Sequence, residues 1–142
     1  MASRNIDDLH PHVATLCRRF KEECAKQGID IIITSTYRSI AEQDALYAQG
    51  RSKPGHRVTN AKGGQSMHNF RVAFDFAPSV NGKIDWNDTE TFTKCGEIAE
   101  SVGLEWAGRW TTFRELAHCQ FTDGLKLADF QAGKTLGPQL SA

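Results

Sequence analysis

The sequence predicts a single α+β domain in which a small, mainly antiparallel sheet carries helices packed on one side. Two long stretches with apolar residues at helical spacing, 11–27 and 88–103, alternate with short β-branched or period-two runs. The chain has 142 residues, the size of one ordinary domain, and no internal repeat or linker composition divides it. We therefore expect one domain over residues 1–142, with a core over about residues 7–133 and a frayed C-terminal tail.

The segments that follow the first helix predict a strand, a short helix and a long loop. Residues 29–36, IDIIITST, form a β-branched run that indicates a buried strand. Ser39 and Glu42 have the spacing of a helix-capping box, so a short helix is expected as far as Gly50. Residues 51–65 lack any apolar period, and a loop of this length in a small domain is commonly functional or mobile.

The second half of the chain contains the clearest strand. Residues 71–78, RVAFDFAP, alternate with period two, so Phe74 and Phe76 share one face while Asp75 stands on the other between two alanines. Asn81 and Gly82 form a tight-turn signal directly after it. The remaining elements expected are two strands and a short helix, at 104–106, 117–121 and 123–133.

The charge and the apolar content exclude several classes of partner. There are 17 basic and 17 acidic residues and no basic stripe, so neither nucleic acid nor an anionic membrane is expected as a partner. The start of the chain lacks the pattern of a signal peptide, and no segment approaches the length of a membrane span, which predicts synthesis in the cytoplasm. The cysteines form no CxxC pair and are expected to be reduced core residues: Cys17, Cys24, Cys95 and Cys119.

Asp75 directs attention to a candidate site, because an aspartate on so apolar a strand is costly to bury unless a partner offsets its charge. His68 lies seven residues earlier, an odd separation that would place it on the opposite face of an uninterrupted strand. It must therefore come from the preceding loop, which the paired glycines at 63 and 64 permit. With His118 in the last predicted strand, two imidazoles and one carboxylate would form an open zinc set with a position left for water.

Two further residues would supply the chemistry beside such a metal. Glu115 lies three residues before His118, where it could act as a general base without binding the metal. Arg38 follows the first predicted strand and could stabilise an oxyanion or bind a substrate carboxylate.

Each of these residues also has a simpler interpretation. Asp75 could form a buried ion pair with an arginine such as Arg38. His118 could be a core histidine that bonds to backbone, and Glu115 an ordinary surface glutamate. Arg38 could pair with an acidic residue of the following helix. Spacing alone does not choose between these interpretations.

Four segments, taken in order, resemble one family of enzymes. They are TSTYRSIAEQDALYAQGR, TNAKGGQSMHNFRVAFDFAP, GKIDWND and WAGRWTTFRELAHCQF. Over roughly residues 29–121 they resemble the zinc-dependent peptidoglycan peptidases of the D-alanyl-D-alanine carboxypeptidase and VanY-like group. Within that group the chain is most similar to the L-alanyl-D-glutamate endopeptidases found as phage endolysins and bacterial wall enzymes.

The resemblance assigns a role to each candidate. The family's Ser-x-His motif, with an aspartate seven residues after the histidine, matches Ser66, His68 and Asp75, of which the last two would be zinc ligands. The family's acid-x-x-His motif matches Glu115 as the catalytic carboxylate and His118 as the third ligand. One zinc ion per chain is implied. The family's Tyr-Arg-Ser block places the arginine that binds substrate or the oxyanion at position 38.

The chain departs from the family pattern near the site. Arg71 stands where the family usually has glycine, and an arginine there would disfavour unusual backbone angles and crowd the substrate. We expect Arg71 to point into the cleft and pair with a carboxylate of the stem peptide. Trp110 is expected to form part of the cleft wall, while Trp106 is expected in the core. Other departures occur at Arg109, Ala117 and Cys119.

Together these features predict a monomeric zinc peptidase that cleaves peptidoglycan stems, at the L-alanyl-D-glutamate bond. It would reach the wall after phage lysis or export. Two alternatives remain: a D,D-carboxypeptidase or dipeptidase on the same polymer, and a non-catalytic zinc domain that binds the cell wall. The family motifs do not choose the bond, because specificity depends on loops, above all residues 51–65.

Overall fold

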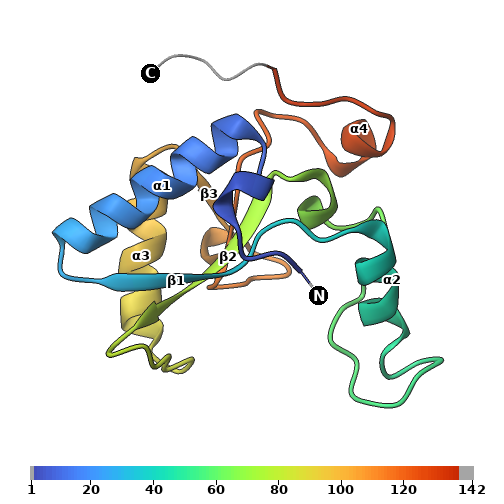
Figure 1. Ribbon diagram of the computed structural model, residues 1–142, viewed down its shortest axis with the longest axis horizontal. Coiled ribbons are helices and arrows are strands. Elements are labelled where there is room, and N and C mark those ends of the chain that lie inside the picture. Colours follow the sequence, from blue (N-terminus) through green and yellow to red (C-terminus); the bar gives the residue numbers. More distant parts are fainter. Residues whose placement is uncertain (1, 138–142) are drawn as a thin grey trace.

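The computed structural model describes residues 2–137, which fold into helices around one four-stranded sheet (Figure 1). The α-helices are α1 (Pro11–Lys26), α2 (Ile40–Ala48), α3 (Thr89–Ser101) and α4 (Leu127–Gln131). The strands are β1 (Asp30–Ser35), β2 (Ala73–Ser79), β3 (Glu105–Trp106) and β4 (His118–Gln120). Short 3-10 helices occur at η1 (Ile6–Asp8), η2 (Met67–Phe70) and η3 (Ala107–Arg109).

The sheet has the strand order β1-β2-β4-β3, and each neighbouring pair is antiparallel. Helices α1 and α3 contact each other, α1 packs on β1, and α3 packs on β2 and β3. This is the predicted α+β architecture with helices on one side of an antiparallel sheet, and the prediction is confirmed. The strands are shorter than the sequence pattern indicated, most clearly β1 and β4, which lie within the expected ranges 29–36 and 117–121.

The helix boundaries follow local chemistry. Pro11 opens α1, where its missing N–H costs nothing, and Gly28 follows the end with a left-handed φ of 77°. Ser39 and Glu42 form the expected capping box of α2. Asp88 caps α3 by accepting a hydrogen bond from the backbone of Thr91.

The hydrophobic core lies between the sheet and the two long helices. On β2, Phe74 and Phe76 are fully buried, and Phe76 contacts the rings of Phe20 on α1 and Phe92 on α3 at centroid distances of 5.0 and 5.8 Å. Strand alternation then turns Asp75 to the face away from these helices. The side that carries the helices is therefore apolar, and the opposite side is available for a polar site.

A small part of the core is built around Trp106, which is buried as predicted. Its indole lies between Gly96 of α3 and Gly108 of η3, and a Cβ added at either glycine would lie 2.1 Å from the ring. The indole Nε1 donates to the carbonyl of Leu116 at 2.9 Å. The two glycines are thus required by the size of the tryptophan.

The turn predicted after β2 is present. Asn81 and Gly82 have φ angles of 53° and 77°, and Val80 and Lys83 exchange backbone hydrogen bonds across them. Between this turn and α3 the structure has no named strand, and the pairing is limited to the bridge between Val80 and Lys83.

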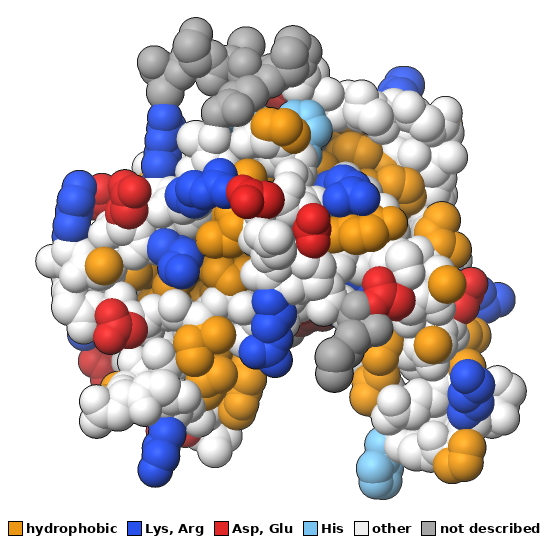
Figure 2. Space-filling view, viewed as in Figure 1, with side chains coloured by type: hydrophobic (Ala, Val, Ile, Leu, Met, Phe, Trp, Pro, Cys, Tyr) orange, Lys and Arg blue, Asp and Glu red, His pale blue; other side chains and the backbone are white. Residues whose placement is uncertain are grey.

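Helix α2 and the following loop form a lobe (residues 40–65) that projects from the sheet (Figure 1). The loop is held by side chains of α2 and by its own: Gln43 donates to the carbonyl of Ala61 at 2.8 Å, and Arg51 donates to that of Thr59 at 3.0 Å. The space-filling view shows a notch between this lobe and the rest of the molecule (Figure 2).

The remaining sequence expectations concern the cysteines, the membrane and the tail. All four cysteines are free and buried, as expected. No helix within residues 2–137 is long and apolar enough to cross a membrane. Leu136 is buried against the core, so packing extends beyond residue 133. The rest of the expected frayed tail, residues 138–142, lies outside the described residues.

Candidate metal centre and cleft

His68 is positioned by the short helix η2. Ser66 caps this helix by accepting a hydrogen bond from the backbone N–H of His68 at 3.2 Å, and the side-chain oxygen of Asn69 accepts one from the backbone N–H of Ser66. The carbonyl of His68 accepts a bond from the backbone of Arg38 at 3.0 Å, which ties η2 to the end of β1. The sequence indicated a loop here, and the structure adds a capped 3-10 turn that holds the buried imidazole.

Asp75 and His118 are brought together by the register of the sheet. The two residues lie directly opposite each other on β2 and β4. Side chains of such cross-strand partners project on the same face, about 5 Å apart at their Cβ atoms. The separation of forty-three residues along the chain is thereby closed by one antiparallel pairing.

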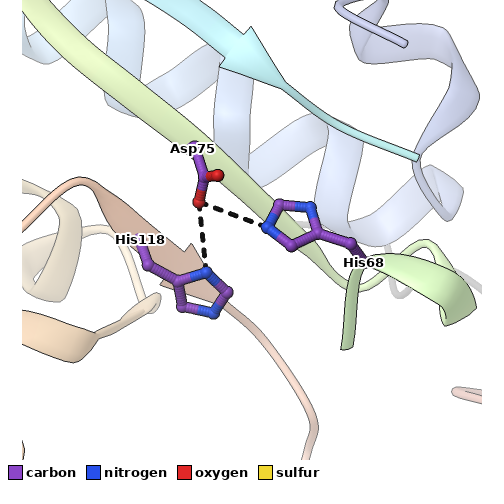
Figure 3. A group of neighbouring side chains, drawn as sticks. All are labelled: His68, Asp75 and His118. Carbon is purple, nitrogen blue, oxygen red and sulfur yellow. Dashed lines mark hydrogen bonds and ion pairs between the residues drawn. The ribbon is translucent and has the colours of Figure 1, made fainter. Parts of the chain in front are cut away.

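The three side chains converge on one point (Figure 3). Asp75 Oδ1 lies 3.2 Å from His68 Nε2 and 3.2 Å from His118 Nδ1. One ligand atom from each residue lies within 4.8 Å of the other two. Within the described part of the chain, these three residues form the one cluster of histidine, cysteine and carboxylate side chains whose ligand atoms lie close enough together to hold a metal ion.

The outer nitrogens of both imidazoles face oxygen acceptors. His68 Nδ1 lies 2.7 Å from the carbonyl oxygen of Thr36, and His118 Nε2 lies 2.9 Å from Gln120 Oε1. Each outer nitrogen must carry the proton to donate these bonds, which leaves the inner nitrogens with lone pairs. Two lone pairs and a carboxylate then point at each other, and a proton or a metal ion between them relieves their repulsion. The donor set of two nitrogens and one oxygen fits zinc.

The electrostatics of the group agree with this interpretation. Burial raises the pKa of Asp75, but its hydrogen bonds with His118 and His68 outweigh burial and hold that pKa well below its ordinary value. Burial lowers the pKa of His118, yet the bond and charge of Asp75 prevail and raise it. Asp75 therefore stays ionised, and a proton or a metal ion would compete for the same place.

Glu115 lies beside the three converging side chains and outside them. Its Oε2 is 3.9 Å from His118 Nδ1, and its side chain is 63% exposed. The carboxylate is thus close to the inner nitrogen of His118 while remaining in contact with solvent. This position suits a base that exchanges protons with water or substrate.

Arg38 lines the same cleft and is held by neutral partners. Its Nη1 donates to Gln43 Oε1 at 2.9 Å, and its Nη2 lies 3.5 Å from Ser35 Oγ. The alternative in which Arg38 neutralises Asp75 is not what the structure shows, since Asp75 bonds to the two histidines. Because no carboxylate is among these partners, the guanidinium charge is available to a ligand.

The cleft has a volume of about 490 Å³, and its lining comes from both sides of the notch. Leu46, Val58, Thr59 and Ala61 contribute from the lobe. From the body of the molecule come the three converging side chains, Arg38, Ser66, Glu115 and the aromatic residues Trp110 and Phe113. The ring of Trp110 lies 5.7 Å from that of His118, so this tryptophan forms part of the cleft wall.

The structure does not bring Arg71 to the cleft. Its guanidinium stacks on the ring of Tyr37 at 3.9 Å and donates to the carbonyl of Asp8 at 2.8 Å. The expectation that arginine disfavours an unusual backbone here is also wrong, because Arg71 has a φ of 65°. The two side-chain contacts offset the strain of that conformation.

Two buried glutamines support the site and were missed by the sequence analysis. Gln120 fixes the orientation of the His118 ring, and Gln43 holds Arg38 with one end of its amide and Ala61 of the lobe with the other. A signal existed for Gln120, which lies two residues after His118 and so on the same face of a strand. Nothing in the local pattern singles out Gln43, because its partners come from distant segments.

Comparison with known proteins decides the family. Residues 6–116 match the family model VanY, D-alanyl-D-alanine carboxypeptidase. The chain belongs to the VanY family. This membership makes it a peptidase, a hydrolase of peptide bonds, and it confirms the resemblance found in the sequence motifs.

Individual relatives agree with the assignment. The peptidoglycan L-alanyl-D-glutamate endopeptidase CwlK of Bacillus subtilis (strain 168) is 41% identical over 122 residues, which cover 80% of this chain and 73% of that protein. The L-alanyl-D-glutamate peptidase of Escherichia phage T5 is 30% identical over 107 residues, covering 73% and 69% respectively. The crystal structure of the Serratia marcescens L-Ala D-Glu endopeptidase ChiX superimposes with a TM-score of 0.64 at 18% identity, covering 92% of each chain, and supports the fold.

Proposed function

We propose that this VanY family member is a zinc peptidase of bacterial peptidoglycan that cleaves the L-alanyl-D-glutamate bond of the stem peptide. The observation that carries the proposal is the convergence of His68, Asp75 and His118 with Glu115 beside them, in a chain 41% identical to an L-alanyl-D-glutamate endopeptidase. The relatives' names support the choice of bond.

Three residues would bind the metal ion, and a fourth would transfer the proton. His68 Nε2, Asp75 Oδ1 and His118 Nδ1 would hold one zinc ion, which supplies Lewis acidity that polarises a carbonyl and makes water more acidic. Glu115 would take the proton from the attacking water and pass it to the leaving amine. Its exposure and its place beside the inner nitrogen of His118 support this role.

Substrate would be held by residues around this centre. Arg38 would bind the developing oxyanion or a stem carboxylate, because its charge is held by neutral partners at the cleft. Trp110 would pack against the bound peptide, and Ser66 would act mainly through the backbone of His68, which it caps. Arg71 is not proposed as a substrate contact, because its side chain is bound to Tyr37 and Asp8.

The protein would act as a monomer on the cell wall, reached after phage lysis or export, and the phage relative supports a lytic role. No membrane or nucleic acid partner is proposed.

The test is mass spectrometry of purified peptidoglycan digested with the zinc-loaded protein. New amino termini on D-glutamate are expected, and they should be absent with Glu115→Ala, which should still bind one zinc ion per chain. Release of terminal D-alanine alone would assign the carboxypeptidase reaction in the description of the family. Zinc binding and binding to sacculi without any released product would refute an enzymatic role on this polymer and favour a non-catalytic domain.

A further inference from the structure

Within residues 2–137, four non-glycine residues adopt a left-handed backbone: Arg71, Asn81, Phe113 and Asp123. Asparagine and aspartate tolerate this conformation, because their short polar side chains bond locally. The strain at Arg71 is offset by its contacts with Tyr37 and Asp8. Phe113, with a φ of 52°, is the bulky residue for which neither explanation holds.

Phe113 contributes little to the fold. Its side chain is 80% exposed, and among the described residues it takes part in no ring contact and does not belong to the hydrophobic core. Trp86 is a useful comparison, because it is 58% exposed but stacks on Phe92 at 6.0 Å. The strained and exposed ring of Phe113 therefore has no intramolecular gain that would explain it.

The backbone around Phe113 is nevertheless held in place. The N–H groups of Trp110 and Glu115 both donate to the carbonyl of Ala107, at 3.2 and 3.3 Å. These two bonds close a small loop, with Phe113 between its ends. Since Trp110 and Glu115 both line the cleft, the loop that presents Phe113 is anchored to the site itself.

Phe113 also lines the cleft, together with an exposed apolar residue of the lobe. Val58 is 57% exposed and contributes from the other side of the notch. With Leu46 and Met67, these residues make part of the lining apolar, next to the polar group of His68, Asp75 and His118. An apolar surface that faces solvent beside a reactive centre is suited to a ligand with its own apolar groups.

We infer that Phe113 and Val58 form an apolar substrate clamp that contacts the methyl and methylene groups of the stem peptide. The inference rests on the proposed function, since it names a specificity determinant of the same site. The strain at Phe113 is then explained by binding: the backbone conformation holds the ring where it packs against substrate. Aromatic rings bury about 150–250 Å² on full contact, so even partial burial makes a measurable contribution to affinity.

The backbone strain makes the test sharp. Phe113→Gly removes the ring and also relieves the left-handed strain, so the variant should be more stable than the parent protein while it binds substrate more weakly. Phe113→Ala removes the ring but keeps a Cβ, so it should weaken binding without the same gain in Tm. A rise in Tm together with a rise in KM is not expected of a residue that supports the fold.

The experiment measures Tm, kcat and KM on soluble stem-peptide fragments of peptidoglycan, with the zinc-loaded protein. Both Phe113 variants, and Val58→Ala to a smaller extent, should raise KM, by about tenfold for Phe113, with kcat within about twofold. Trp86→Ala is the matched control, an exposed aromatic away from the cleft, and should lower Tm while leaving KM unchanged. An unchanged KM in both Phe113 variants, or a lower Tm in Phe113→Gly, would overturn the inference.

A binding measurement separates this inference from the proposed function. Binding of the same fragments to Glu115→Ala protein should weaken by about tenfold when Phe113→Ala is added, and this readout needs no turnover. If the parent protein cleaves nothing but the binding difference is found, the proposed reaction fails and the clamp stands. If cleavage occurs and binding is equal with and without the ring, the reaction stands and the clamp fails.

Discussion

The role of Gln120 leads to a prediction about metal affinity. Gln120 Oε1 accepts the outer N–H of His118 at 2.9 Å, and both side chains are buried. This bond keeps the lone pair of Nδ1 directed at Asp75. Gln120→Leu replaces the amide by an apolar side chain of similar size and removes the acceptor, so the buried N–H of His118 loses its partner.

The size of the effect can be worked from that bond. A buried donor left without an acceptor costs about 1–3 kcal/mol. Because about 1.4 kcal/mol is tenfold in a binding constant, zinc affinity should fall by about 5- to 150-fold. Partners that orient a metal-binding histidine commonly contribute about 10- to 100-fold, which agrees with this range. Gln120→Glu keeps an acceptor at the same place and should retain zinc affinity, whatever the orientation of the native amide.

The assay is competition for zinc with a chromogenic chelator, at fixed pH, for the parent protein and both variants. Gln27→Leu, a substitution at an exposed glutamine far from the site, serves as the control for adding an apolar side chain. The Tm of the zinc-free proteins shows whether any loss comes from unfolding. Equal zinc affinity in Gln120→Leu and the parent would refute the argument that this bond orients His118.

Three further predictions concern stability and the Arg71 position. Gly96→Ala should lower the free energy of unfolding by about 1–2 kcal/mol in denaturant titration, because overpacking against Trp106 at 2.1 Å outweighs the better helix propensity of alanine. Glu97→Ala, on the exposed side of α3, is the control. Equal stability of Gly96→Ala and the parent protein would contradict the packing argument. Arg71→Gly should leave KM unchanged and alter the free energy of unfolding by no more than about 1 kcal/mol, since relief of the left-handed backbone strain offsets the lost contacts. A tenfold change in KM would show instead that Arg71 contacts substrate. Removal of zinc by a chelator should lower Tm, because an ion present at 100 times its Kd stabilises the folded state by about 2.7 kcal/mol; a Tm insensitive to zinc would contradict the metal site.

Much of the fold could be predicted because it depends on local patterns. The apolar periodicity of α1 and α3, the capping box of α2 and the alternation of β2 are each written in consecutive residues, and each element formed where it was expected. The tight turn at Asn81 and Gly82 belongs to the same class. Strand lengths were less predictable, because a strand ends where its partner ends.

The site was predictable in its members and not in its support. The motifs pointed to His68, Asp75 and His118 as a group, but the partners Gln120 and Thr36 that orient the two imidazoles followed from no motif. These partners are supplied by whichever backbone or side chain the fold places behind each ring.

Local periodicity and side-chain chemistry are enough to specify the set of elements, the apolar and polar faces of β2, and the residue types able to bind a metal. That Asp75 and His118 face each other depends on the register between β2 and β4, which follows from the packing of the whole fold. The fold also turns Arg71 away from the cleft, because contacts with the distant residues Tyr37 and Asp8 hold its side chain. It places Phe113 at the cleft, because backbone bonds to Ala107 hold the loop that presents this ring.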